Sequence, residues 1–128
     1  MRLLLDPHTF LWFIADDPHL PVSARALLES DIELLLSTAS LWEMAVKVSI
    51  GKLSLGEPYE VFIPQQLALN RIEVLQITIT HLATVSGLPL HHRDPFDRLI
   101  IAQALVEDLP LVGGDAAFDA YGIKRMWT

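Results

Sequence analysis

Four carboxylate side chains stand where a predicted helix begins or has just begun. Three of them follow short apolar runs that we interpret as strands, and one lies at the start of the longest predicted helix. They are Asp6, Glu43, Asp97 and Asp115. In a parallel sheet, strand-to-helix joins meet at the carboxyl edge, where open α/β folds bind ligands. Asp97 joins the other three if its helix starts at the same edge, which a right-handed crossover permits.

Carboxylates gathered in this way repel one another unless a cation lies among them. All-oxygen ligands suit Mg²⁺ or Mn²⁺, which are hard ions that keep several bound waters. Such an ion lowers the pKa of a water molecule and stabilises a phosphoryl oxyanion. The pattern therefore predicts a metal-dependent nuclease.

The net charge is −7, from 16 acidic and 9 basic residues. A protein that binds nucleic acid through phosphate neutralisation should instead be basic. Either nucleic acid is not the partner, or bound cations offset part of the negative charge.

Each acid also has a purely local interpretation. Asp6, Asp94 and Asp115 have the context of helix N-caps, and the first two are each followed by proline, which suits the first helical position. Ser40 and Glu43 have the spacing of a capping box, which places Glu43 in the first turn of its helix. Taken singly, the cap interpretation is favoured; taken together, the acids favour a metal site.

The elements that must position these acids can be predicted from alternating apolar runs and helical patterns. The predicted strands are 3–5, 32–36, 72–77 and 110–112, with 124–127 as an edge strand. The predicted helices are 8–15, 22–28, 40–50, a segment within 58–71 that is interrupted or begins near Pro64, 80–87, 95–109, and a short one from 115 to 122. Short continuous apolar strands are typical of a parallel sheet covered on both faces. We predict a single domain over residues 1–128, an α/β fold with a mainly parallel four- or five-stranded sheet in a three-layer α/β/α sandwich.

Composition excludes several classes of protein. The apolar content of 52% and mean hydropathy of +0.38 argue for a buried core. The absence of cysteine excludes disulfides, thiolate metal sites and a cysteine nucleophile. No apolar run approaches the roughly 18 residues that span a bilayer, and no cleavage site follows Leu3–Leu5. We therefore expect an unprocessed cytoplasmic protein with no membrane partner.

Four longer segments give a more specific indication: LLLDPHTFLWF, STASLWEMAVKVSIGKL, LPLHHRDPFDRLIIAQA and LPLVGGDAAFDAYGI. Through them, essentially the whole chain resembles the PIN-domain ribonucleases, and most closely the toxins of VapBC-type toxin–antitoxin systems. The resemblance implies an α/β/α sandwich, a Mg²⁺-dependent RNA endonuclease, and a homodimer inhibited by a cognate antitoxin. The family's acidic quartet falls on Asp6, Glu43, Asp97 and Asp115 as metal-binding and catalytic residues. The spacing to Ile100 favours Asp97 over Asp94.

Two departures from the family pattern bear on activity. Pro7 follows the first acid where close relatives often have threonine, and Gly113-Gly114 precedes the last acid where threonine or serine is usual. Both remove hydroxyls that could position water or phosphate. They leave open a catalytically weak or silent PIN domain that binds antitoxin or RNA. A receiver-like signalling domain is disfavoured, because no second acid adjoins Asp6 and no lysine ends the 110–112 strand.

Other side chains have less specific contexts. We expect His91 and His92 to be loop residues rather than catalytic ones, and Arg98 to form a salt bridge rather than bind RNA phosphate. Trp12 and Trp42 have apolar helical spacing and are predicted to lie in the core. Lys47 and Lys52 could either steer RNA or line a solvated helix face. We expect His8, His19 and His81 to be structural or exposed.

Overall fold

Five short strands form one sheet in which every neighbouring pair runs parallel. The strand order is β3-β2-β1-β4-β5. The strands are β1 (Arg2–Leu5), β2 (Glu33–Ser37), β3 (Ile72–Leu75), β4 (Leu111–Val112) and β5 (Arg125–Met126). The helices are α1 (Pro7–Ile14), α2 (Val22–Glu29), α3 (Thr38–Ser49), α4 (Tyr59–Leu69), α5 (Ile79–Gly87), α6 (Pro95–Glu107) and the 3-10 helix η1 (Ala116–Tyr121). The computed structural model describes all residues from 1 to 128.

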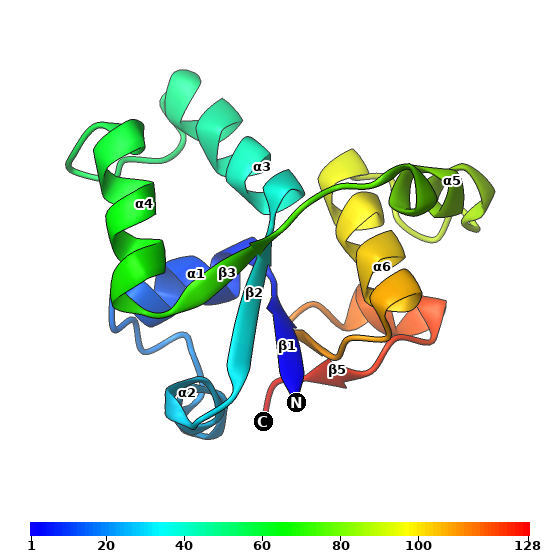
Figure 1. Cartoon of the computed structure of the whole chain (residues 1–128), viewed down its shortest axis with the longest axis horizontal. Coiled ribbons are helices and arrows are strands. Elements are labelled where there is room, and N and C mark those ends of the chain that lie inside the picture. Colours follow the sequence, from blue (N-terminus) through cyan, green and yellow to red (C-terminus); the bar gives the residue numbers. More distant parts are fainter.

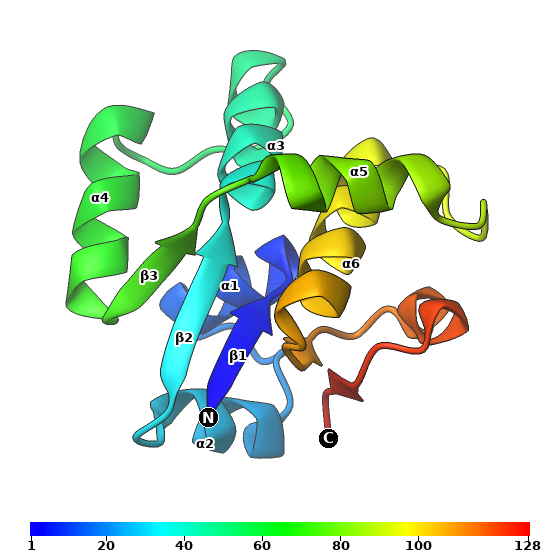
Figure 2. The same ribbon diagram turned by 45° about the vertical axis from the view of Figure 1, so that its right-hand side comes forward.

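The central strand β1 divides the core into two halves. Its three leucines are fully buried, and successive side chains point to opposite faces of the sheet. Leu3 and Leu5 pack with side chains of α1, α2 and α4, whereas Leu4 packs with side chains of α6 and η1. Helices therefore cover both faces of the sheet (Figures 1 and 2). The predicted three-layer α/β/α sandwich is confirmed, with five strands.

The register of the sheet brings several chain segments to one edge. Leu5, the last residue of β1, pairs with Leu36 of β2 on one side and with Val112 of β4 on the other. The residues that follow these strands therefore leave the sheet side by side. Asp6 comes directly after β1, and the segments that carry Glu43 and Asp115 come after β2 and β4.

Helix α3 begins earlier than the sequence pattern predicted. The side chain of Ser37 accepts a hydrogen bond from the Ala39 N–H at 2.9 Å and caps the helix, which starts at Thr38. The prediction of a capping box between Ser40 and Glu43 was wrong, because a serine one turn earlier already caps the helix. Glu43 lies in the second turn, and its carboxylate is not used as a cap.

The other boundaries agree with the predictions to within a few residues. Helix α4 starts at Tyr59 and continues through Pro64, so the proline neither interrupts nor begins it. The segment after Asp115 is a 3-10 helix, and β5 is the predicted edge strand. None of the helices has the length and apolar character needed to cross a membrane.

Candidate active site

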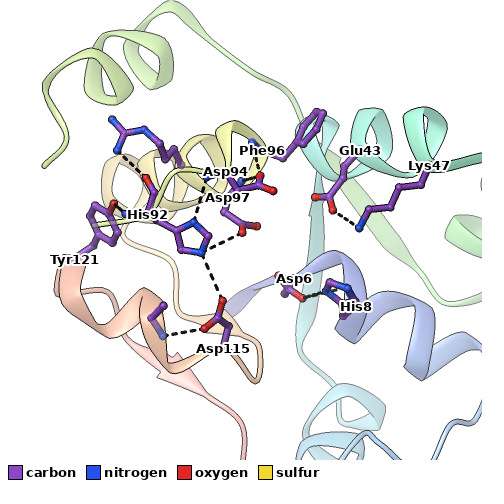
Figure 3. Close-up of polar contacts among 12 residues, drawn as sticks. Asp6, His8, Glu43, Lys47, His92, Asp94, Phe96, Asp97, Asp115 and Tyr121 are labelled. Carbon is purple, nitrogen blue, oxygen red and sulfur yellow. Dashed lines mark hydrogen bonds and ion pairs between the residues drawn. The ribbon is translucent and has the colours of Figure 1, made fainter. Parts of the chain in front are cut away.

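A cavity of about 620 Å³ opens at the edge of the sheet where β1, β2 and β4 end. Carboxylates from four different parts of the chain line it (Figure 3). They are Asp6, Glu43, Asp94, Asp97 and Asp115. All four acids singled out by the sequence pattern therefore face one space, together with Asp94.

Asp6 is fixed by local backbone chemistry. Its Oδ2 accepts a hydrogen bond from the His8 N–H at 3.0 Å and caps α1, with Pro7 at the first helical position. The His8 ring lies beside the same oxygen, with Nδ1 3.3 Å away, and this contact raises the pKa of His8. Gly113 lies against the acid, because a Cβ there would be 3.1 Å from the Asp6 Cβ. The cap therefore holds the Asp6 carboxylate at the cavity.

Glu43 is a buried carboxylate with one unpartnered oxygen. The residue is 6% exposed, and its Oε2 lies 2.7 Å from Nζ of Lys47 on the next turn of α3. The other oxygen, Oε1, is buried with no hydrogen-bond partner. The ion pair with Glu43 raises the pKa of Lys47. Lys47 thus has a defined partner in the cavity, which its four-residue spacing from Glu43 could have indicated.

Asp94 and Asp97 differ in what their oxygens do. Asp94 Oδ1 accepts hydrogen bonds from the Phe96 and Asp97 N–H groups, at 2.9 and 3.0 Å, and caps α6. Asp97 follows in the first turn, and neither of its oxygens is needed for that cap. Burial raises the pKa of the Asp97 carboxyl from 3.8 to about 7, with Asp94, Asp6 and Glu43 adding to the rise and His92 opposing it.

His92 belongs to this cluster, although the sequence pattern indicated only a loop residue. Its Nε2 lies 3.3 Å from Asp97 Oδ2 and 3.5 Å from Asp115 Oδ2 (Figure 3). Its Nδ1 accepts from the Asp94 N–H at 3.4 Å, which assigns the ring proton to Nε2, facing the carboxylates. The backbone N–H of His92 donates to the Tyr121 hydroxyl at 2.8 Å. No periodic pattern signals this contact between a loop and η1.

Asp115 completes the set from the far side of β4. Its Oδ1 accepts from the Ala117 N–H at 3.0 Å and caps η1, while Oδ2 points towards His92. It is the most exposed of the predicted acids, with 53% of its side chain accessible. One of its oxygens is thus used by the backbone and the other faces the cavity.

The prediction that Arg98 forms a salt bridge was wrong. Its guanidinium donates to backbone carbonyl oxygens that belong to the end of α5 and the loop before α6. The acceptors are Pro89 at 3.1 Å, Val85 at 3.2 Å, and Leu88 and His92 at 3.4 Å. Arg98 therefore ties down the loop that presents His92, using several donors of its planar fork.

Of the two tryptophans predicted to be core residues, Trp12 packs against the core and Trp42 does not. Trp42 is 57% exposed on α3 and packs edge-on against Phe96. Trp12 is half-buried: one side packs against the core, and the ring also lines the cavity together with Trp127. An apolar helical spacing does not distinguish the wall of a cavity from the core beneath it.

The donor atoms of this cavity fit a hard divalent cation. Glu43, Asp94 and Asp97 each offer an oxygen, and these oxygens lie within 4.8 Å of one another. His92, Asp97 and Asp115 offer a second such group. Glu43 Oε1 is buried without a partner, and after burial the neighbouring carboxylates add to the raised pKa of Asp97, so the acids would gain from a cation among them. The cluster could therefore hold a metal ion.

Comparison with known proteins points to one family. The sequence pattern of the PIN domain matches residues 3–124. Ribonuclease VapC22 of Mycobacterium tuberculosis is 32% identical over 127 residues, which cover 98% of this chain and 96% of that protein. The structure of VapBC2 from Rickettsia felis, bound to a DNA fragment from its promoter, aligns over 100% of both chains with a TM-score of 0.72 and 18% identity. A toxin–antitoxin complex from Klebsiella pneumoniae aligns over 88% of this chain and 86% of that one, with a TM-score of 0.59 and 16% identity. The chain belongs to the PIN-domain family.

Proposed function

We propose that this protein is an endoribonuclease, the toxin of a type II toxin–antitoxin module, and that it hydrolyses RNA phosphodiester bonds with Mg²⁺, for which Mn²⁺ can substitute. The observation that carries the proposal is the convergence of Asp6, Glu43, Asp97 and Asp115 on one cavity. Membership of the PIN-domain family and the similarity to a protein named as a ribonuclease support it.

Asp6, Glu43, Asp97 and Asp115 are the residues we assign to hold the metal. A bound divalent ion would supply a water of lowered pKa and a counter-charge for the phosphoryl oxygens. Asp94 is assigned the cap of α6, where its Oδ1 accepts from two backbone N–H groups.

The chain's own side chains prepare this site in three ways. Lys47 balances one oxygen of the buried Glu43 and leaves the other free to bind. His92 presents its Nε2 proton to Asp97 and Asp115, and so holds two carboxylates close together that would otherwise repel. The caps of α1 and η1 fix the orientation of Asp6 and Asp115 before any ligand arrives. A preorganised site of this kind loses little free energy to rearrangement.

The alternative of a catalytically silent domain rested on the missing hydroxyls at Pro7 and Gly113-Gly114. Packing gives a structural reason for both glycines. A side chain at 113 would crowd Asp6, and one at 114 would lie 3.0 Å from ring atoms of Trp127. Both glycines thus have a packing reason that is independent of catalysis.

We propose that the cognate small antitoxin, a second copy of this chain and the RNA substrate are its partners, and that it acts in the cytoplasm. The similarity to VapBC2 and to a complex described as toxin–antitoxin supports the protein partners. Exposed apolar side chains on α4 and α5, namely Val61, Leu69, Ile79 and Leu82, are consistent with such contacts.

The proposal is tested by expressing the protein with and without the small protein encoded next to it, and by mapping the ends of cleaved RNA. We expect growth arrest that the neighbour relieves, and new RNA ends that appear only with the wild-type chain. Absence of arrest, together with absence of new ends, would favour the silent domain.

A further inference from the structure

Aromatic rings line the cavity beside the carboxylates. We call the rings of His8, Trp12, His19 and Trp127 the aromatic patch; all four line the cavity. Trp12 is at its centre: its ring centroid lies 5.3 Å from that of His19, 5.8 Å from His8 and 6.0 Å from Trp127. The His19 and Trp12 planes are stacked, 21° apart. Three separate segments of the chain therefore meet to form one aromatic surface.

The aromatic patch is continuous with the acidic site at two points. His8 follows Asp6 by two residues and contacts its carboxylate. At the other end, the Trp127 indole packs on the backbone of Gly114, the residue before Asp115. A group bound at the acids would therefore have its neighbour within reach of the rings.

The absence of a side chain at Gly114 leaves room for the Trp127 ring. A Cβ at position 114 would lie 3.0 Å from two carbons of the indole and 3.3 Å from its nitrogen. The backbone there does not have the positive φ that would itself require glycine. The glycine is thus needed for the close approach of the ring.

These rings lie at the margin of the core, against which Trp12 and Trp127 pack. The side chains of His19 and His8 are 72% and 58% exposed, and both tryptophans are half-buried. By contrast Phe10 and Phe118, which belong to the core, are at most 1% exposed. The patch thus leaves aromatic surface open to the cavity.

Several basic side chains are already paired within the protein. Of nine lysines and arginines, four are already engaged. Lys47, Arg25 and Arg125 pair with acids, and Arg98 is held by carbonyl oxygens. A protein with a net charge of −7 gains from a source of affinity that does not depend on charge. Stacking of bases on aromatic rings is such a source, and it strengthens binding by roughly 5- to 150-fold per base.

We propose that the aromatic patch binds an unpaired nucleobase of the RNA strand by stacking, next to the phosphate held at the acidic site. This rests on the proposed nuclease function and adds the part of the substrate that the cavity recognises. Single-stranded RNA is the form whose bases are free to stack on such rings.

The test uses the full-length chain with Trp42→Phe, so that indole fluorescence reports only on Trp12 and Trp127. Binding is titrated in Ca²⁺ in place of Mg²⁺, with RNA integrity checked on a gel. One probe is a short single-stranded RNA, and the other is an oligomer of the same length and charge that lacks bases. We expect the RNA to quench the fluorescence, and the baseless oligomer to bind at least about 5-fold more weakly.

Trp127→Leu in this background should weaken RNA binding by about 5-fold or more and leave binding of the baseless oligomer unchanged. Trp127→Phe should keep RNA affinity within about 2-fold, because a ring face remains. If Trp127→Leu fails to fold by circular dichroism, His19→Ala serves instead, since that ring is exposed. Wild-type and W42F proteins should bind alike, because Trp42 lies outside the cavity. Equal affinity for the two oligomers would overturn the proposal that the aromatic patch stacks on a base. So would unchanged RNA affinity in Trp127→Leu or, where it is used instead, in His19→Ala.

Cleavage of the same RNA in Mg²⁺ separates this inference from the function on which it rests. Base-dependent binding without cleavage would support base stacking on the aromatic patch and contradict the proposed nuclease activity. Cleavage together with base-independent binding would support the nuclease activity and contradict base stacking on the aromatic patch.

Discussion

Nε2 of His92 lies 3.3 Å from Oδ2 of Asp97, and the same nitrogen is 3.5 Å from Asp115. One loop histidine thus sits between carboxylates from two elements of the fold. It has the position of an outer residue that orients the proposed metal ligands Asp97 and Asp115. His92 also lowers the pKa of Asp97, whereas burial raises it.

His92→Ala should therefore weaken the site without removing a proposed metal ligand. The pKa of Asp97 should rise further, so that the acid limb of the pH profile for cleavage moves to higher pH. The loss of activity near pH 7 should be about 10-fold or more, as for other residues that orient metal ligands. His91→Ala is the matched control, because that ring packs on Tyr121 instead. An unchanged pH profile for His92→Ala would contradict this role.

Asp97→Asn should stabilise the metal-free protein at neutral and alkaline pH. The pKa of Asp97 is 3.8 in its ordinary state and about 7 in the folded chain, so the folded state binds the extra proton. The stability contributed by this group is present at low pH and is lost as pH rises towards 7. The free-energy difference from wild type at pH 8 should be about 1–4 kcal/mol, the upper value corresponding to the full pKa change.

Urea unfolding in EDTA at pH 4 and pH 8 measures this difference. The two proteins should be similar at the lower pH and diverge at the higher one. Asp119→Asn is the control, because Asp119 is an exposed partner of Arg125 and its pKa is lowered. Equal stability of Asp97→Asn and wild type at pH 8 would show that ionisation of Asp97 does not destabilise the folded protein.

Lys47→Met should destabilise the metal-free protein by about 1 kcal/mol, because it leaves the buried Glu43 carboxylate without its cation. Lys47 is partly exposed, so solvent limits the effect. Adding Glu43→Gln should remove most of the loss, which thermal unfolding of the four proteins in a double-mutant cycle can measure. The comparison variant is Lys52→Met, on the loop after α3. Additive effects of the two substitutions would argue against the ion pair as the cause.

Gly114→Ser should lower stability by about 1–3 kcal/mol, because the new side chain meets the Trp127 ring. The combination with Trp127→Leu should be less damaging than the sum of the single changes, since the clash is then relieved. Thermal unfolding of both single variants and the double variant measures the coupling. If the effects simply add, the indole is not what requires glycine at this position.

The layer architecture followed from the apolar pattern because LLL of β1, LLLS of β2 and LV of β4 are buried on both faces. The edge strands β3 and β5 are only partly buried. The positions of Asp6 and Asp115 also followed, because caps at strand-to-helix joins are local backbone features. The start of α3 did not follow, since Ser37 and Ser40 both suit a cap and only packing selects between them.

Residues whose roles depend on distant contacts were not predictable. His92 joins the site because its loop returns to Tyr121 and is held by Arg98. Trp127 enters the cavity because the chain end crosses beside Gly114. Neither contact leaves a periodic or short-range signal in the sequence.

The most direct test of the account compares Mg²⁺-dependent RNA cleavage by wild type, Asp97→Asn and Asp94→Asn. Asparagine is as good an N-cap as aspartate, so Asp94→Asn should keep α6 and stay within about 10-fold of wild type. The cleavage rate of Asp97→Asn should fall at least about 100-fold, as expected when an electrostatic group at the reacting centre is removed. EDTA should abolish cleavage by the wild-type protein. Cleavage that survives EDTA, or equal loss in the two variants, would contradict the assignment of the acids to a metal site built around Asp97.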